Sequence, residues 1–192
     1  MNEETYRLFI AIELAEEMRE GIASIQERLR RIDNNCIRWT QPDGAHLTLK
    51  FLGNVSGQKV SSLASAMQAA CVGQMPFTLS LSVPGVFPDK AHPRVLWVGL
   101  EGDTQTMATL QHKVDAGCQK LGFAAEPQSF SPHITLGRVR DHASLQVSQQ
   151  VATSLLTSGV RKGSQRVDRI SLIRSVLGPN GPKYTRLKET IF

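Results

Sequence analysis

The chain of 192 residues is long enough for one compact domain with a sizeable core. Its N-terminal segment is acidic, which argues against a signal peptide, and it has no apolar run long enough to predict a membrane-spanning helix. Its three cysteines lie far apart and outside any CxxC spacing, which argues against a disulfide framework or a zinc site and favours reduced thiols in the cytoplasm. Residues 138–192 carry ten Lys and Arg against three Asp and Glu, and this local excess favours a polyanionic partner such as a nucleic acid.

The first half of the chain alternates between two kinds of apolar pattern. Short apolar runs predict strands, whereas apolar residues at mixed three- and four-residue spacing predict helices. In chain order we expect a strand, a helix, a strand, a helix and a strand at residues 7–12, 18–29, 46–49, 59–72 and 77–83.

The second half follows the same order. We expect its strand, helix, strand, helix and strand at residues 94–99, 107–121, 133–136, 143–156 and 166–176. Glycines and prolines at residues 178–182 predict a turn, and a last strand is expected at residues 184–191.

The two halves repeat each other at an offset of 87 residues. The apolar run that opens with Arg7 falls on the one that opens with Arg94, and His46–Leu49 falls on His133–Leu136. The approximate repeats, residues 5–85 and 92–176, predict a single domain over residues 1–192 with two similar lobes. Two such lobes facing each other would place an active site on the pseudo-twofold axis.

Each repeat contains the pattern His-x-Thr followed by an apolar residue. Residues two apart on a strand point to the same face, so each motif places an imidazole beside a hydroxyl. Because histidine titrates near pH 6.5, one imidazole can serve as an acid and the other as a base. The two hydroxyls can hold an anionic group. Two imidazoles and two hydroxyls are suited to cleaving a phosphodiester without a metal. The sequence contains neither a His-Glu-x-x-His motif nor a Gly-rich phosphate-binding loop, so metal-assisted or ATP-driven chemistry has little support.

The paired motifs resemble the signature of the two-histidine phosphoesterase superfamily. The wider sequence is similar to its LigT-like branch, the RNA 2′,3′-cyclic phosphodiesterases that are also called 2′-5′ RNA ligases. The similarity extends over nearly the whole chain, through residues 7–12, 38–40, 46–53, 93–99, 131–138 and 171–175.

This resemblance implies an α+β fold with two pseudo-symmetric lobes, each a mainly antiparallel sheet with outer helices, around a central cleft. It implies hydrolysis of a terminal 2′,3′-cyclic phosphate to a 2′-phosphomonoester, together with 2′-5′ joining of RNA ends without ATP in some members. The expected partner is an RNA with a 2′,3′-cyclic phosphate end, such as a tRNA fragment. We expect a monomer that uses no cofactor, no metal and no membrane.

The resemblance also assigns roles to the motif residues. It implies that His46 donates a proton to the leaving 3′-oxygen and that His133 accepts a proton from water. Thr48 and Thr135 would bind the non-bridging oxygens, where charge builds toward the transition state.

Three further residues are candidates near the phosphate. Lys50 shares the catalytic face with Thr48 if the strand is regular, or else lies at the rim of the cleft. Arg138 stands at an odd offset from His133 and would point away unless Gly137 lets the strand bend or bulge; because the family has a phosphate-binding arginine there, we expect such a bend. Phe9 is a possible substrate contact. It could stack on a base, as could Trp39 and Trp97, although aromatic residues in strands more often belong to the core.

Two alternatives remain open. The protein could hydrolyse small cyclic nucleotides without contacting a longer RNA, which the basic segment 138–192 argues against. It could also be a non-catalytic module that binds RNA ends, although binding alone does not require two titrating side chains.

Overall fold

The computed structural model describes residues 4–33, 35–126, 130–160, 163–178 and 181–192. The described chain contains the expected strands and helices with two differences. The single strand expected at residues 166–176 is divided into β7 (Ser164–Val167) and β8 (Arg169–Gly178), which lie at different places in the sheet, and the apolar pattern does not predict the short strand β2 (Ile37–Trp39). The strands are β1 (Thr5–Glu13), β2 (Ile37–Trp39), β3 (His46–Ser56), β4 (Phe77–Phe87), β5 (Val95–Gly102), β6 (His133–Val139), β7 (Ser164–Val167), β8 (Arg169–Gly178) and β9 (Gly181–Ile191). The helices are α1 (Glu16–Arg30), α2 (Val60–Cys71), α3 (Thr104–Lys120) and α4 (Leu145–Thr157), with single 3₁₀ turns at Pro42–Gly44 and Gly57–Lys59.

The helices form where the sequence supplies an apolar stripe and favourable ends. In α1 the apolar residues at three- and four-residue spacing are all buried, with acidic residues in the first turn and basic residues in the last, as the helix dipole favours. In α4 the Ser144 side chain caps the N-terminus by accepting a hydrogen bond from the Val147 amide. The turn expected at residues 178–182 joins β8 to β9, although residues 179 and 180 lie outside the described residues.

The strands form one curled antiparallel sheet in the order β7-β4-β5-β6-β3-β1-β8-β9, with β2 beside β6. Its two halves are related by an approximate twofold axis, because β1 lies between β3 and β8 as β5 lies between β6 and β4. The halves join where β3 meets β6, at the pair Leu47 and Ile134. These are the middle residues of the two His-x-Thr motifs, so the axis passes between the motifs.

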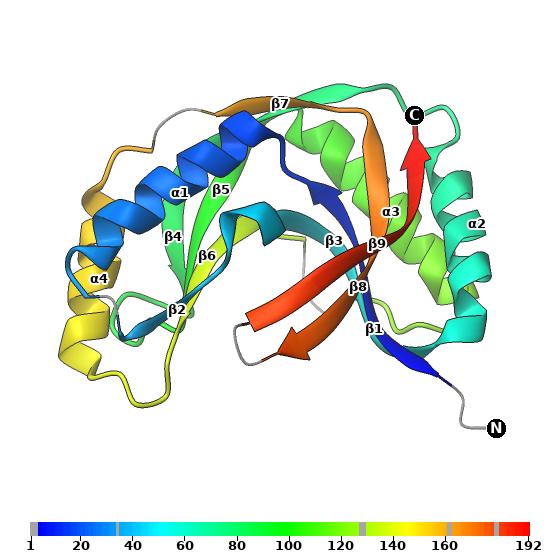
Figure 1. The fold of residues 1–192 in the computed structure, drawn as a ribbon. Helices are drawn as coiled ribbons and strands as arrows, with labels where there is room; N and C mark the ends of the chain where they lie inside the picture. Colours follow the sequence, from blue (N-terminus) through cyan, green and yellow to red (C-terminus); the bar gives the residue numbers. More distant parts are fainter. Residues whose placement is uncertain (1–3, 34, 127–129, 161–162, 179–180) are drawn as a thin grey trace.

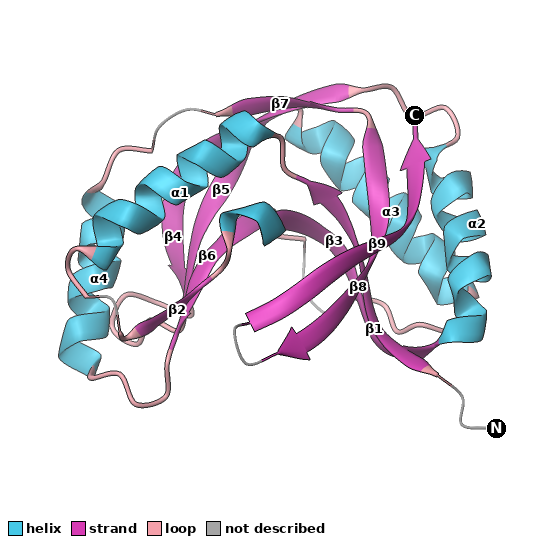
Figure 2. Ribbon diagram, viewed as in Figure 1, coloured by secondary structure: helices cyan, strands magenta, loops and turns pink. Residues whose placement is uncertain are grey.

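The four helices lie on the outer side of the curled sheet (Figure 2). In Figure 1, α1 and α4 cover the lobe that contains β4, β5 and β6, whereas α2 and α3 cover the lobe that contains β1, β3 and β8. Each lobe therefore combines elements of both sequence repeats. From the first repeat, α1 and β4 lie in the lobe of β5 and β6; from the second repeat, α3 and β8 lie in the lobe of β1 and β3. The lobes do not coincide with residues 5–85 and 92–176.

The first strand of each repeat corresponds at an offset of 86 residues, not 87. Ala11 lies opposite Thr48, and Trp97 lies opposite Thr135. The expected superposition of Arg7 on Arg94 is therefore wrong by one position, and it would have exchanged the two faces of the strand. Leu8, Ile10 and Ile12 enter the main core, whereas Phe9 and Ala11 form a small cluster with Ile173 against Tyr184. Within the described chain, no helix is both long and apolar enough to cross a membrane.

Candidate active site

The four motif side chains line one small pocket on the pseudo-twofold axis. Its volume is about 160 Å³, and its walls are Thr40, His46, Thr48, His133, Thr135, Arg138 and Tyr184. Leu47 and Ile134 point to the opposite face and are fully buried, which fixes the polar residues on the cleft face. The sequence prediction that both motifs share one site is therefore correct in its geometry.

Both histidines are oriented by the same local contact. The Nδ1 of His46 lies 2.7 Å from the Gly44 carbonyl oxygen, and the Nδ1 of His133 lies 2.7 Å from the Ser131 carbonyl oxygen. A carbonyl oxygen only accepts hydrogen bonds, so each Nδ1 carries the proton. Nε2 of each ring is thereby left as the atom that can give or take a proton.

The rings around His46 differ from those around His133. His46 stacks on Phe9 with the ring centroids 4.5 Å apart, and it meets the edge of Tyr184 at 5.2 Å. Burial lowers the pKa of His46, while the Gly44 carbonyl and the charge of Glu13 act in the opposite direction. His133 instead meets Phe87 edge to face at 5.1 Å, with Trp97 at 6.0 Å. Phe9 is only 3 % exposed, so it supports His46, and a direct contact with substrate stays a prediction.

A bulge follows the threonine in each motif strand. The ladder between β1 and β3 skips Leu49, because Ala11 pairs with Thr48 and Ile10 with Lys50. The ladder between β5 and β6 skips Leu136 in the same way, since Trp97 pairs with Thr135 and Leu96 with Gly137. Because each motif strand contains one extra residue at the bulge, the side chains beyond the bulge point to the face opposite to the one expected for a regular strand.

The second bulge carries Arg138 into the site. Arg138 lines the small pocket together with the two histidines. This is the bend expected from Gly137, where a Cβ atom would come within 2.6 Å of the Ile37 Cγ2 atom. Glycine thus lets β2 pack closely against the bulged strand.

The first bulge carries Lys50 away from the site, so its expected position on the catalytic face or the cleft rim is wrong. Lys50 is 3 % exposed. Its Nζ atom donates to the Ala124 carbonyl oxygen at 2.6 Å and lies 2.6 Å from an Asp115 carboxylate oxygen and 3.4 Å from one of Glu126. Lys50 is a buried structural charge, and Phe51 takes the place on the cleft side that a regular strand would give it.

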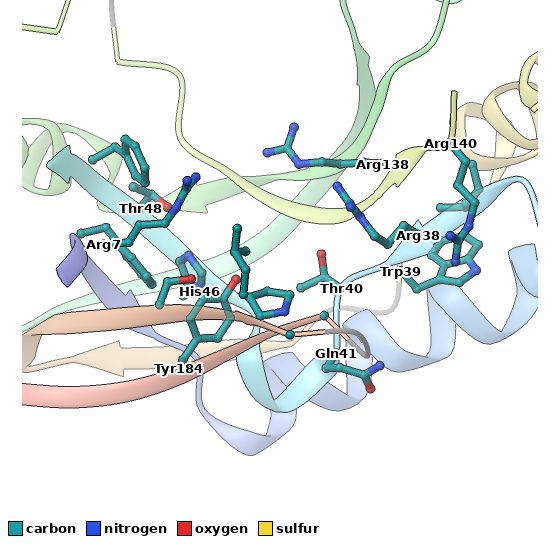
Figure 3. A pocket seen from close by; sticks show the side chains of 18 of the residues that line it. Arg7, Arg38, Trp39, Thr40, Gln41, His46, Thr48, Arg138, Arg140 and Tyr184 are labelled. Carbon is teal, nitrogen blue, oxygen red and sulfur yellow. The ribbon is translucent and has the colours of Figure 1, made fainter. Parts of the chain in front are cut away.

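A second, larger pocket of about 1190 Å³ opens beside His46 (Figure 3). His46 and Thr48 belong to its lining, whereas His133 and Thr135 do not. Five arginines contribute to it: Arg7, Arg30, Arg38, Arg138 and Arg140. Only the last two belong to the basic segment 138–192; Arg166 lies on β7 outside both pockets, and Arg161 and Lys162 lie outside the described residues.

Sequence reasoning missed several residues of these two pockets, chiefly Thr40, Arg7, Arg38, Arg140 and Tyr184. They come from four separate segments, and no local spacing connects them with the motifs. Among the described residues no group of three or more His, Cys, Asp or Glu side chains is placed to hold a metal ion. All three cysteines are buried free thiols, and burial raises the pKa of each.

Comparison with known proteins places the chain in a family. The family model described as LigT like Phosphoesterase matches twice, at residues 12–97 and 98–184. A protein of Methanothermobacter thermautotrophicus named RNA 2′,3′-cyclic phosphodiesterase is 34 % identical over 95 % of this chain and 96 % of its own length. One of the same name from Thermotoga maritima is 32 % identical, over 97 % of this chain and 95 % of its own length.

Solved structures agree with this assignment. A crystal structure of a Thermus thermophilus protein matches with a TM-score of 0.78 and 27 % identity, over 96 % of this chain and 97 % of that one. The crystal structure of Escherichia coli LigT complexed with 3′-AMP matches with a TM-score of 0.75 and 27 % identity, over 98 % and 99 % of the two chains. With a family model that covers nearly the whole sequence, this chain belongs to the LigT-like phosphoesterases.

Proposed function

We propose that the protein is an RNA 2′,3′-cyclic phosphodiesterase that opens the terminal cyclic phosphate to a 2′-phosphomonoester. One observation carries the proposal: two imidazoles, each with Nδ1 held by a carbonyl oxygen, share a small pocket with two threonines and Arg138. Relatives that bear the name RNA 2′,3′-cyclic phosphodiesterase support the choice of substrate.

The reaction needs a base and an acid on opposite sides of the phosphorus. His133 takes a proton from the attacking water through Nε2, and the water oxygen bonds to phosphorus. The bond to the 3′-oxygen breaks on the far side, and Nε2 of His46 gives that oxygen its proton. Thr48, Thr135 and Arg138 hold the non-bridging oxygens as their charge increases. The next turnover requires only a proton exchange between the histidines and solvent.

The same site suits a second reaction. A 5′-hydroxyl of another RNA end, placed where water attacks, would give up its proton to His133 and form a 2′-5′ bond. Energy for the new bond comes from the strained cyclic ester, so this reaction consumes no ATP. It is part of the proposal as an activity secondary to hydrolysis.

The proposal extends to the setting of the enzyme. The catalytic pocket is formed within one chain, which supports a monomer. The buried free thiols support a cytoplasmic location, where RNA cleavage products such as tRNA fragments would be available as substrates. We propose that neither a metal nor a cofactor takes part, because the two histidines supply both proton transfers.

The two alternatives make different demands on the structure. A hydrolase of small cyclic nucleotides would use the small pocket alone, whereas the larger pocket is bigger than most small-molecule sites. A non-catalytic binding module would not need two imidazoles with free Nε2 atoms on the axis.

The test is incubation of the purified protein with a short RNA that ends in a 2′,3′-cyclic phosphate, in the presence of EDTA, followed by identification of the product isomer. We expect the 2′-phosphomonoester. The matched control is His142→Ala, which removes an exposed histidine outside both pockets. Accumulation of the 3′-phosphate would exclude the assigned leaving group, and loss of turnover on chelation with recovery on adding a divalent ion would exclude the two-histidine mechanism.

A further inference from the structure

The two pockets are arranged asymmetrically about the catalytic axis. The small pocket contains both histidines, whereas the larger pocket adjoins only His46. We propose that the larger pocket is the path of the RNA on the 5′ side of the cyclic phosphate, and that Arg30, Arg38 and Arg140, here called the outer arginines, bind the internucleotide phosphates there. The inference rests on the proposed function, and it assigns a direction to the bound strand.

The direction follows from the chemistry of ring opening. The 3′-oxygen that leaves phosphorus stays attached to the terminal ribose, and water attacks from the opposite side. The terminal ribose must therefore lie on the side of the group that protonates the 3′-oxygen. Since that group is His46, the ribose and the chain that continues from its 5′-oxygen leave the small pocket on the His46 side, which is where the larger pocket opens.

The charge of the larger pocket matches a polyanion. Its lining includes five arginines and no carboxylate among the described residues. Arg38 lies directly opposite Arg138 in the ladder between β2 and β6, and like charges in that position destabilise a sheet. Arg140, two residues beyond Arg138, is also exposed.

The outer arginines differ from arginines elsewhere on the molecule. Arg169, Arg174 and Arg186 each form an ion pair with a carboxylate. In the part of the chain that the structure describes, none of the outer arginines forms an ion pair. An unpaired cluster of guanidinium groups around a concave surface is a site for phosphates, and arginine suits this role because its fork-shaped head binds two phosphate oxygens.

Two of the outer arginines, Arg30 and Arg38, have defined positions before RNA arrives. The Arg30 guanidinium, in the last turn of α1, lies over the Trp39 ring with its carbon 5.5 Å from the centroid. Arg38 is fixed by β2, which packs against the backbone of Gly137.

In Figure 3 the side chains of Arg38 and Arg138 extend into the pocket between His46 and the pair Trp39 and Arg140, so the cations continue outward from the catalytic histidine. Arg7, on β1, also lines this pocket.

The size of the pocket indicates how much RNA it takes. About 1190 Å³ exceeds the roughly 300–1,000 Å³ of ordinary small-molecule sites, so the pocket has room beyond a single nucleotide. We therefore expect the enzyme to distinguish an oligonucleotide from a mononucleotide bearing the same cyclic end.

The test compares kcat/KM for a cyclic mononucleotide and for a four-residue RNA that ends in the same 2′,3′-cyclic phosphate. For the wild type we expect a ratio of oligonucleotide to mononucleotide of at least tenfold. In the double variant R38A/R140A this ratio should fall by at least tenfold. The slope of log K against log salt concentration for oligonucleotide binding should become shallower by about 1.4, because each of the two lost single-strand phosphate contacts contributes about 0.7. The matched control is Arg166→Ala, an exposed arginine on β7 outside both pockets, which should leave the ratio unchanged.

A neutral methylphosphonate at the first internucleotide linkage tests the direction. In the wild type this replacement should weaken oligonucleotide turnover, and in R38A/R140A it should have little further effect, because the charge and its binding site have been removed together. The same replacement at the linkage farthest from the cyclic end should matter less.

The outcomes separate two kinds of failure. If the wild type turns over neither substrate, the proposed function is wrong. If it turns over both with equal kcat/KM, or if Arg166→Ala lowers the ratio as much as R38A/R140A does, the function stands and the path through the larger pocket is wrong.

Discussion

Glu13 lies directly opposite His46 in the ladder between β1 and β3, whereas the residue opposite His133 in the ladder between β5 and β6 is Gly99. The Glu13 carboxylate accepts two hydrogen bonds from Arg186, at 2.8 and 2.9 Å, which hold it in place. Two histidines with the same local geometry therefore have different electrostatic surroundings. A fixed carboxylate favours the protonated form of its neighbour, and here it acts against burial, the larger effect, which lowers the pKa of His46.

The substitution Glu13→Gln should move the alkaline limb of the pH profile of kcat/KM to lower pH. The carboxylate raises the pKa of His46 against the effect of burial, so its removal lowers that pKa and the donor loses its proton earlier as pH rises. The other titratable or charged groups around His46 all remain. They are Tyr184, Arg138 and His133 in the small pocket, the remaining arginines of the larger pocket, and Arg186, which loses its carboxylate partner.

The control for this measurement is Glu16→Gln, an exposed carboxylate at the start of α1. It should leave both limbs in place. Movement of the acid limb in Glu13→Gln, with the alkaline limb fixed, would mean that His46 is the base and His133 the acid.

Replacing His46 or His133 with alanine should lower kcat by roughly 10²-fold or more, the usual effect of removing a general acid or base. The double variant should lose much less than the product of the single losses, because the two groups act in one step. Single-turnover assays on the four-residue RNA measure these rates. Turnover near that of the wild type in either single variant would place the chemistry on other residues.

Lys50→Met should destabilise the protein without abolishing turnover. It leaves Asp115 and Glu126 without their cation, and we expect about 3 kcal/mol of lost unfolding free energy, the low end for breaking a buried ion pair, because Asp115 keeps 13 % exposure. Denaturant titration measures the loss. Lys188→Met, an exposed lysine on β9, is the control and should change stability by less than about 0.5 kcal/mol. Equal stability of the two variants would contradict a structural role for Lys50.

Gly137→Ala should cost roughly 1–3 kcal/mol of unfolding free energy, as overpacking does in a close-packed region. The added Cβ would lie 2.6 Å from the Ile37 Cγ2 atom and 3.1 Å from the Arg38 carbonyl oxygen, so β2 must shift. Gly117→Ala is the matched control, because its Cβ meets neighbours at 3.5 Å or more inside α3 and should stabilise the helix by up to about 1 kcal/mol. The thermal unfolding midpoints of the two variants should move in opposite directions.

The sequence allowed the elements and the centre of the site to be predicted, because these depend on local periodicity. Apolar spacing located the helices, and His-x-Thr placed two side chains of each motif on one face of a strand. Gly137 allowed a bend in the second motif strand, and the position of Arg138 was expected from the resemblance to a family with a phosphate-binding arginine there. Nothing local marks the first bulge at Leu49, and the alternation rule therefore misplaced Lys50.

Other features could not be predicted because they depend on contacts between distant segments. Tyr184 reaches the small pocket from the last strand, and Arg38 reaches the larger one through pairing of β2 with β6. The shift from 87 to 86 residues in the first strand appears only in the pairing of β1 and β5 with their neighbours. The basic C-terminal segment was a poor guide to the pocket, because Arg169, Arg174 and Arg186 are engaged by carboxylates.

The crossing of α1 and β4 into one lobe, and of α3 and β8 into the other, makes the two halves of the chain mutually dependent. A chain cut in the segment between β4 and β5 would yield two fragments, each with an uncovered sheet face and a missing strand. Neither fragment should fold by itself, yet mixed in equal amounts they should assemble and recover turnover, as two subunits of a dimer would. This arrangement is that of a domain-swapped dimer of half-length chains with one active site on its twofold axis, in which the two chains are joined end to end as one polypeptide.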